Sequence, residues 1–583
     1  HKVSIICENK EFYKPYGKEF VYELDEFTPQ PFFPKLLELE NEVNRGWYSK
    51  VLDSSISFKG YSLAEILYID FFDQIINPVL VKFIKLKFLL EKMQPEVVII
   101  FGRGYQSKIL KHLCLRMNIK VYNLAEKWFI DNIWFPLLEK AYPYILPIFV
   151  LIAFVFLIII TLYDMLIIGN NQKENRSKDK IVIFTPHEEN FLRRAQSLAK
   201  LDRDRVYFML MLPFCRWKVY KCSILQKLIG PDIKYGFVSS STRDLLPIIK
   251  NSISLYMLIF KKILKLPRIK LVSYDIYLPI SHLVYKLLLF FSIHCLLKAV
   301  CHIQIGYRFL TIVSKKVVFI NANLAKARAL NLVFKKNGIT TYQLQHGMIE
   351  AISGYRTNVV KNLAWSNFDA KLLKQFSNDD IVIPNCYPHY EVIKTKLKKF
   401  DGKYYRLSDR KKKIVIFTSP ISWEMRYVKR YINTVLNAIT NFNHIDVVIK
   451  IHPAENIKWY AQLLQKQSMH FSIIKDANIF DLFEKADVII TPYSSVIVEA
   501  LFFKKPILIF SIPIYDKSTL FGYINPERVF SDSDDLIVKM TQLLNGNTFT
   551  YNVDLTPENQ LFETYFGHNV PFINLSDFIL QDE

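Results

Sequence analysis

The sequence lacks the residue patterns that usually hold metal ions or nucleic acids. Its seven cysteines are scattered, no CxxC pair occurs, and none stands at a metal-binding spacing from a histidine. No Asp-x-Asp pair follows a predicted strand, and RNA-recognition, zinc-finger and basic-zipper motifs are absent. We therefore expect no metal, no resident cofactor and no nucleic-acid partner, with free thiols in a reducing compartment.

Basic residues outnumber acidic residues. The chain has 76 Lys and Arg against 54 Asp and Glu, a formal net charge of +22. Such a balance favours an anionic partner, such as a nucleotide phosphate, an acidic glycan or an anionic membrane surface. The 583 residues exceed what one hydrophobic core supports, so two or three domains are expected.

Residues 141–163 form a long run without charge, which is long enough for a helix to cross a hydrocarbon core of about 30 Å. Tyr142, Tyr144 and Tyr163 lie near its ends, where interfacial aromatic residues belong. Basic residues within 173–180 follow it and favour a cytoplasmic C-terminal part. The sequence thus predicts a membrane span or in-plane anchor over residues 141–168, and a location at the cell membrane with the catalytic part facing the cytoplasm. A buried core helix is the alternative.

From residue 180 onward, short β-rich apolar runs alternate with helical patterns, which is typical of an α/β fold with parallel sheets. We predict two facing doubly wound Rossmann-like domains with a cleft between them, at 180–393 for the acceptor and 413–583 for the nucleotide donor. The predicted strands lie at 181–185, 317–321, 341–345 and 381–384 in the first sheet, and at 414–418, 446–451, 472–474, 488–491 and 506–510 in the second.

The first 140 residues contain a pattern similar to one in the first predicted sheet. Residues 95–124 and 315–344 both read as strand, helix and strand, the βαβ pattern. Chance similarity is the alternative, because buried parallel strands are all rich in Val and Ile. The first copy has Glu126 where the second has His346, so residues 1–140 are predicted to be a non-catalytic α/β segment.

Three short motifs follow predicted strands in the last part of the chain, where an open α/β sheet binds its ligands. His346 is the candidate general base for an acceptor hydroxyl, and Gly347 allows a sharp turn beside it. Gly347 and Glu350 are predicted to lie on the acceptor side. A structural role for His346 at the strand end is the alternative.

The other two motifs are predicted to bind the phosphate of a nucleotide-activated donor. Lys450 and His452 can meet a phosphate, with Pro453 fixing the next turn, or can merely end a strand and a loop. Two hydroxyls and free N–H groups at a helix start form an anion site, although serine there is also a common N-cap. The predicted donor-binding residues are Lys450, His452, Pro453, Ser494, Ser495 and Glu499.

The His-Gly, His-Pro and Ser-Ser series within residues 310–515 resembles the two-domain GT-B transferases of bacterial surface polymers. These include CDP-glycerol glycerophosphotransferases of teichoic acid synthesis and capsular sialyl- and Kdo-transferases. The resemblance implies that His346 is the base, and that His452 and the pair Ser494 and Ser495 hold the donor phosphate. Residues 383–385, Ile-Pro-Asn, resemble the segment that ends the first domain in that group. Two features depart from it: no acidic-acidic-Gly motif occurs, and residues 348–350 replace the usual Thr-Pro-Leu-Lys.

The resulting prediction is a metal-independent, membrane-associated transferase. It would move a sugar or polyol phosphate from a nucleotide-activated donor, CMP-, CDP- or UDP-linked, to a surface glycan or lipid-linked acceptor in polysaccharide or capsule synthesis. A non-hydrolysing sugar-nucleotide epimerase and a non-catalytic scaffold for polysaccharide assembly are the alternatives.

Overall fold

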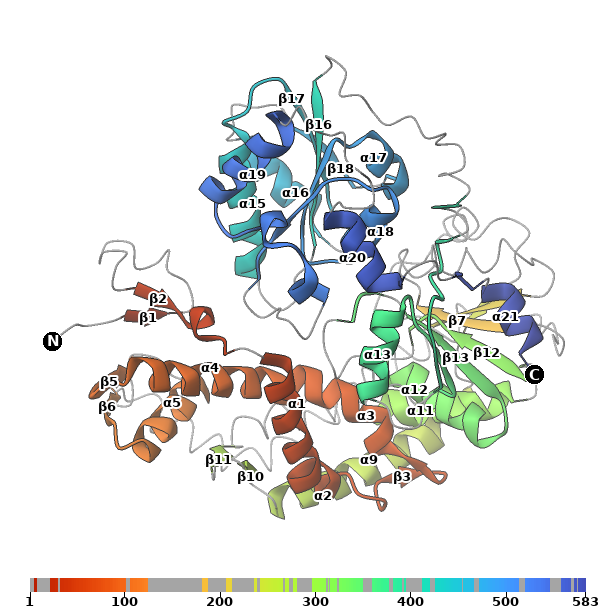
Figure 1. Ribbon diagram of the computed structural model, residues 1–583. Coiled ribbons are helices and arrows are strands. Elements are labelled where there is room, and N and C mark those ends of the chain that lie inside the picture. Colours follow the sequence, from red (N-terminus) through yellow and green to blue (C-terminus); the bar gives the residue numbers. More distant parts are fainter. Residues whose placement is uncertain are drawn as a thin grey trace. The chain divides into compact units, whose positions relative to one another are not determined.

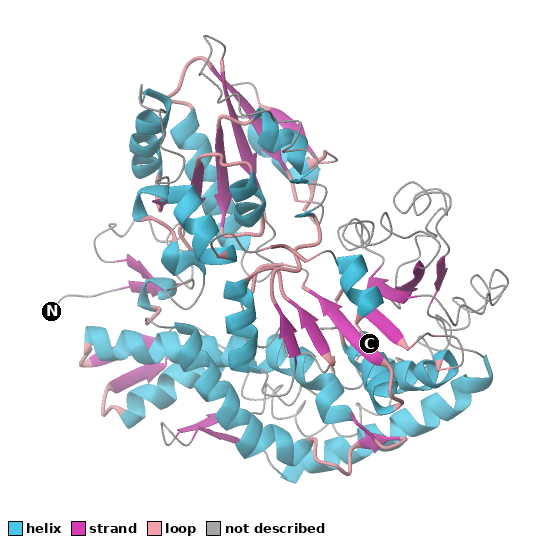
Figure 2. Cartoon of the chain, turned by 45° about the vertical axis from the view of Figure 1, so that its right-hand side comes forward, coloured by secondary structure: helices cyan, strands magenta, loops and turns pink. Residues whose placement is uncertain are grey.

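The computed structural model forms two compact units, each a parallel sheet with helices (Figures 1 and 2). The first is His1–Leu344 with Ala351–Asn362 and Phe376–Ile381, and the second is Gln345–Glu350, Leu363–Gln375 and Val382–Glu583. The structure describes residues 5–7, 21–29, 32–100, 105–123, 181–186, 206–211, 235–237, 242–265, 268–271, 276–279, 296–310 and 313–582, the last range without 314, 322–323, 346, 350–358, 377–380, 391–392, 395–410, 420–424, 453–454, 466–470, 476, 513–519, 546–556, 568–570 and 574.

A six-stranded sheet forms the centre of the second unit, and all its neighbouring strand pairs are parallel. The order across the sheet is β18-β17-β16-β19-β20-β21, so the strand that comes first in sequence lies in the middle. This is the strand order of the dinucleotide-binding Rossmann fold. The strands are β16 (Lys412–Phe417), β17 (Ile445–Lys450), β18 (Ser472–Ile474), β19 (Val488–Pro492), β20 (Ile507–Phe510) and β21 (Val529–Phe530).

Both faces of this sheet are covered by helices. Every residue of β19 and β20 is buried, as expected for parallel strands that have helices on both sides. In Figure 1, α15 (Met425–Ile439) and α19 (Ser533–Asn545) lie on one side of the sheet, and α17 (Ile479–Lys485) and α18 (Val496–Phe502) lie on the other. The buried Tyr431 hydroxyl of α15 lies 2.9 Å from the carbonyl O of Phe417 and 3.1 Å from that of Ile490, so it ties β16 to β19.

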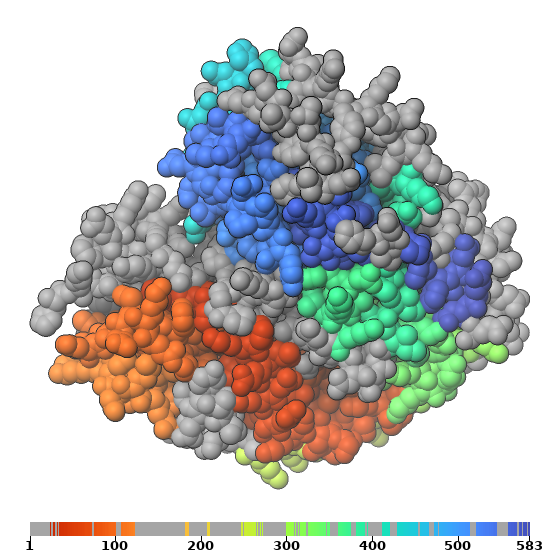
Figure 3. Space-filling view, viewed as in Figure 1, coloured from red at the N-terminus to blue at the C-terminus, as the bar shows by residue number. Residues whose placement is uncertain are grey.

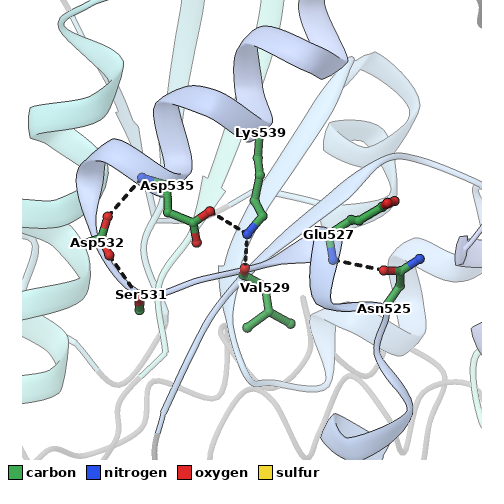
Figure 4. A network of polar contacts seen from close by, with 7 residues as sticks. All are labelled: Asn525, Glu527, Val529, Ser531, Asp532, Asp535 and Lys539. Atoms are coloured by element: carbon green, nitrogen blue, oxygen red, sulfur yellow. Dashed lines mark hydrogen bonds and ion pairs between the residues drawn. The ribbon is translucent and has the colours of Figure 1, made fainter.

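Hydrogen bonds of the acidic residues after β21 fix the start of α19 (Figure 4). The backbone N–H of Asp535 donates to the Asp532 carboxylate (2.9 Å), and the Ser531 hydroxyl donates to it as well (3.0 Å). The first of these bonds is the largest cause that lowers the pKa of Asp532. Lys539 Nζ reaches both the Asp535 carboxylate and the Val529 carbonyl, each at 2.6 Å. The acidic pair therefore caps and anchors a helix.

A seven-stranded sheet of the same plan belongs to the first unit, except for the last residues of β14 and β15, which group with the second unit. Its order is β15-β14-β13-β12-β7-β8-β9, so the strand order again reverses beside the first strand of the sheet, between β7 and β12. β7 pairs in parallel with β8 and β12, and β12 pairs in parallel with β13. The strands are β7 (Ile181–Pro186), β8 (Val206–Met211), β9 (Tyr235–Phe237), β12 (Lys316–Phe319), β13 (Thr340–Leu344), β14 (Lys361–Leu363) and β15 (Ile381–Ile383).

Helices of the N-terminal segment pack onto this domain. α3 (Leu63–Phe71) contacts α11 (Leu296–Phe309) and α12 (Ala325–Lys336). Arg328 of α12 is 1% exposed; its Nε donates to the carbonyl O of Ile66 at 2.6 Å, and its guanidinium pairs with Asp70. The described residues before 124 are mostly helical, with α1 (Phe32–Val43) and α4 (Asn77–Met93), and they form the red-to-orange surface in Figure 3.

The similarity between residues 95–124 and 315–344 is visible in the structure. α5 (Tyr105–Arg116) and α12 occupy positions that differ by 220 residues at both ends. The residue with positive φ after each helix, Asn118 or Gly338, also differs by 220. The strands then differ by one residue in register, because Val97 pairs with Lys120 whereas Val317 pairs with Thr341. The shared feature is therefore a helix with its C-terminal cap inside a βαβ unit.

One part of the predicted fold class is corrected: it included a hydrophobic membrane segment. Among the residues that the structure describes, no helix is both long enough and apolar enough to cross a membrane. The longest, α9 (Thr242–Lys265), carries four lysines, and α4 carries charges along its length. The predicted segment at 141–168 lies outside the described residues, which themselves form two parallel sheets covered by helices.

Candidate functional site

The reversal of strand order between β16 and β19 marks the candidate site in the second unit. Ligands of open α/β sheets bind outside the carboxyl ends of the strands at such a reversal. Thr418 follows β16, His452 follows β17, and Ser494 follows β19. Because these are adjacent strands in the sheet, His452 and Ser494 lie two strand spacings apart, about 10 Å. Two of the three predicted motifs therefore meet at one edge of one sheet.

A hydrogen-bond network fixes the turn that contains His452. The His452 N–H donates to Thr418 Oγ1 (2.9 Å) and lies 3.3 Å from Glu455 Oε2. The Glu455 carboxylate also accepts the hydroxyl protons of Thr418 and of Tyr460, the latter at 2.7 Å. Lys475 Nζ, after β18, donates to the Glu455 carbonyl (2.7 Å). Three strand ends are thereby joined around the half-buried His452.

The predicted phosphate ligands differ in how they are held. Lys450 is buried, and its ammonium donates to the carbonyl O of Ile451 at 3.0 Å. Glu499 is buried in the first turn of α18. Pro453 lies outside the described residues. Burial of a lysine requires hydrogen bonding of its ammonium, and the carbonyl supplies one such bond at the sheet edge.

The two serines before α18 have different roles. Ser494 Oγ accepts the N–H of Val496 at 3.3 Å and lies 3.3 Å from Thr491 Oγ1, so it supports the helix start. Ser495 is the N-cap residue by position but makes no capping hydrogen bond with its side chain. Ser494 therefore has the structural role of supporting the turn. The Ser495 hydroxyl is not used for capping, so it is the better candidate for a ligand-binding role.

This difference predicts opposite effects of alanine at the two positions. Ser494→Ala removes a capping contact and is expected to lower the free energy of unfolding by about 1 kcal/mol. Ser495→Ala is expected to leave stability unchanged and to weaken donor binding about tenfold, through loss of one hydrogen bond to an anion. Urea unfolding and titration with a nucleotide donor measure the two effects. Equal behaviour of the two variants in both measurements would contradict the assignment.

The third motif lies on a turn tied to a buried carboxylate. His346 and Glu350 lie outside the described residues, but Gln345 and Gly347 are described and group with the second unit. Gln345 Nε2 donates to the Gly347 carbonyl (2.7 Å) and to Asp369 Oδ2 (2.6 Å). Gln345 also accepts the backbone N–H of Trp365 on Oε1 and the Trp365 indole N–H on its own carbonyl O, both at 2.7 Å. The convergence of His346 with the donor-binding motifs stays a prediction.

Sequence reasoning missed the side chains that support these motifs. Thr418, Glu455 and Tyr460 hold the His452 turn, and Asp369 holds the Gln345 turn. A threonine directly after a strand was the available signal for the first. Within the described residues, no group of three or more side chains that could hold a metal ion occurs.

The comparison with protein families agrees with the site. Residues 432–565 match the model of the CDP-glycerol:poly(glycerophosphate) glycerophosphotransferase family. The matched range contains Lys450, His452, Ser494, Ser495 and Glu499. It confirms the predicted resemblance to the GT-B transferases of surface polymers and the prediction that the chain is a transferase. No curated protein sequence matches the chain significantly.

Solved structures with some similarity include enzymes that use nucleotide sugars. The UDP-GlcNAc 2-epimerase of Neisseria meningitidis, bound to UDP-GlcNAc, is 12% identical over 69% of this chain and 97% of its own, with a TM-score of 0.41. A putative UDP-N-acetylglucosamine 2-epimerase of Listeria monocytogenes is 10% identical over 69% and 95%, with a TM-score of 0.42. MurG of Acinetobacter baumannii is 10% identical over 69% and 98%, with a TM-score of 0.36. With TM-scores below 0.5, these three proteins carry no weight in the assignment.

Proposed function

We propose that this transferase moves a glycerol phosphate, or a related sugar or polyol unit, from a nucleotide-activated donor to a surface glycan or lipid-linked acceptor. The observation that supports this most is the coincidence of the family match, residues 432–565, with the strand-order reversal that carries His452 and Ser495. The family description specifies CDP-glycerol as donor and poly(glycerophosphate) as acceptor, so these are the first substrates to test.

In the proposed reaction, the second unit binds the donor and stabilises the leaving nucleotide phosphate. As the bond to the transferred group breaks, negative charge grows on that phosphate, and fixed hydrogen-bond donors lower the energy of this state. The His452 imidazole, the Ser495 hydroxyl and the Lys450 ammonium are the proposed donors. His346 takes the proton of the acceptor hydroxyl. The proposed reaction uses no metal ion.

The net charge of +22 supports an anionic acceptor. Poly(glycerophosphate) carries one negative charge per unit, and a basic surface raises its local concentration at low salt. We place the protein at the cytoplasmic face of the cell membrane, where a nucleotide-activated donor and a lipid-linked acceptor meet. Fractionation of cells after a high-salt wash tests this location.

Release of CMP from CDP-glycerol with a short poly(glycerophosphate) acceptor tests the function. Thermal shift with CMP, CDP, UDP and GDP conjugates identifies the donor, since a ligand at about 100 times its Kd stabilises the folded state by about 2.7 kcal/mol. Conversion of a sugar nucleotide without acceptor would favour an epimerase. Normal folding with no response to any nucleotide would favour a scaffold, and either result would contradict the proposal.

His452→Ala should weaken donor binding more than it slows turnover. Loss of a hydrogen bond to a charged phosphate corresponds to a Kd that rises about 10- to 100-fold. His444→Asn is the matched control, because His444 is exposed and has φ +67, a conformation that asparagine tolerates. Isothermal titration with CDP-glycerol measures both variants. An unchanged Kd for His452→Ala would remove this histidine from the donor site.

A further inference from the structure

Asp369 is a buried carboxylate that the proposed reaction does not use directly. It lies in the first turn of α13 (Asn367–Phe376) and is 2% exposed. A buried charge of this kind is costly unless hydrogen bonds or opposite charges compensate it. No salt bridge to Asp369 is recorded among the described residues, so its stabilisation comes from hydrogen bonds.

Four groups donate hydrogen bonds to this carboxylate. Gln345 Nε2 does so at 2.6 Å, and the hydroxyl of Tyr565 bonds to the same oxygen, Oδ2. The backbone N–H of Ile349 and the hydroxyl of Ser366 also interact with it. Two of these donors, Gln345 and Ile349, stand on either side of the His-Gly motif in the sequence. The other two come from the start of α13 and from α20 (Pro557–Phe566).

We propose that Asp369 is a positioning residue for the transfer reaction: its carboxylate fixes both ends of the turn Gln345–Ile349, which contains the predicted base His346. The inference rests on the proposed function, because it assumes that His346 acts on the acceptor. Asp369 itself touches neither substrate. Tyr565 extends the arrangement to α20, since its hydroxyl reaches Asp369 and the carbonyl of the next residue, Phe566, accepts from Asn367 Nδ2 at 3.0 Å.

The ionised form of Asp369 accepts all four bonds without rearrangement. Protonation, or replacement by an amide, puts hydrogen on one of the two oxygens, so that the hydroxyl of Tyr565 or Ser366 would have to turn and accept a bond that it now donates. Burial raises the pKa of Asp369 to about 7, although the bonds from Tyr565 and Gln345 act to lower it. Its titratable neighbour is Tyr565, whose own pKa burial raises well above the usual range, and Tyr493 faces Tyr565 in turn. Protonation of Asp369 below pH 7 should therefore loosen the turn.

The stability of the folded state follows the same titration with a definite sign. The folded pKa of about 7 lies above the ordinary value of 3.8, so between these values the folded chain binds more protons than the unfolded one. This contribution to stability is complete below pH 3.8 and declines as the pH rises toward 7. Asp369 therefore becomes the ionised acceptor near pH 7, where this contribution to stability has been lost.

Asp369→Asn in the full-length chain tests the inference, with CMP release from CDP-glycerol as the assay. We expect kcat to fall about 10- to 100-fold, as for a displaced catalytic base, while the Kd for CDP-glycerol stays within about threefold. Asp534→Asn, which changes an exposed carboxylate of the same unit, is the control and should behave as wild type. The inference would be overturned if a folded Asp369→Asn variant kept the wild-type kcat. It would also be overturned if the variant lost activity only through a higher Kd for CDP-glycerol.

Tyr565→Phe provides a second variant that preserves bulk if Asp369→Asn fails to fold. It removes one donor to the carboxylate and should raise the pH at which kcat begins to fall. In the wild type, kcat should decline as Asp369 becomes protonated below pH 7, and Asp369→Asn should remove this part of the pH dependence. An unchanged pH profile in Tyr565→Phe would count against the positioning role. Absence of CMP release by the wild type would instead count against the proposed function.

Discussion

Replacing His346 with alanine is expected to lower kcat by about 10²- to 10⁴-fold, the range for loss of a general base. The Kd for CDP-glycerol should change little, because the proposed donor ligands follow β17 and β19 of the six-stranded sheet. A group that acts only as the acceptor hydroxyl loses its proton contributes to the transition state and not to donor binding. Single-turnover CMP release and donor titration on the same preparation measure the two quantities.

Two further variants distinguish a base from a structural histidine at this position. His346→Gln can still donate a hydrogen bond but cannot take a proton at neutral pH, so it should be nearly as slow as the alanine variant. His444→Asn should keep wild-type kcat, since this exposed histidine lies outside the site. A His346→Ala variant that turns over normally but binds CDP-glycerol weakly would make His346 a donor ligand and would refute the assignment.

Strands rich in Ile and Val could be predicted from the sequence, whereas β8, which is Val-Tyr-Phe-Met-Leu-Met, and strands of mixed composition could not. β16 contains the apolar run 414–417 and β19 the apolar run 488–490, each followed by a threonine, and the predicted strands agree with them to within two residues. β14 is Lys-Asn-Leu and β21 has two residues, so neither carries a periodic signal. Their place in a sheet is set by the neighbouring strand, which is a tertiary effect.

The candidate site divides in the same way. The places of His452 and Ser494 near strand ends could be predicted, because each stands two residues after a strand and next to residues that favour turns. The side chains that hold these turns could not. Asp369 and Tyr565 are 196 residues apart in sequence, and nothing near either one indicates the other. The sequence could not show which of Ser494 and Ser495 supports the helix start. That depends on which hydroxyl accepts a backbone N–H, and only the structure shows this.

The predicted membrane segment depends on a local signal alone, and it lies outside the described residues. A long chargeless run predicts a span by length and hydropathy alone. The helices that the structure describes show why length is insufficient: α9 is long, but its lysines recur along it, and α3 is strongly apolar but short. The apolar residues of α3 are instead buried within the first unit.

The second large expected effect concerns the stability of the contact between the N-terminal segment and α12. Arg328→Ala is expected to lower the free energy of unfolding of the first unit by about 3 kcal/mol, the lower end for breaking a buried ion pair, because Asp70 is 18% exposed and water can still solvate it. The substitution also leaves the Ile66 carbonyl without its 2.6 Å bond. Urea unfolding followed by hydrogen exchange in α3 and α12 measures the loss.

Lys335→Ala, an exposed change on the same helix, serves as the control and should cost less than about 0.5 kcal/mol. Asp70→Ala combined with Arg328→Ala should cost less than the sum of the two single changes, because the pair interacts directly. If α3 were a separate module, Arg328→Ala would destabilise neither α3 nor α12, and residues 1–123 could be removed without loss. The buried guanidinium argues against this, because a charged side chain at 1% exposure needs partners, and those of Arg328 on α3 are Ile66 and Asp70. We therefore expect α3 and α12 to lose protection together, as parts of one cooperative unit.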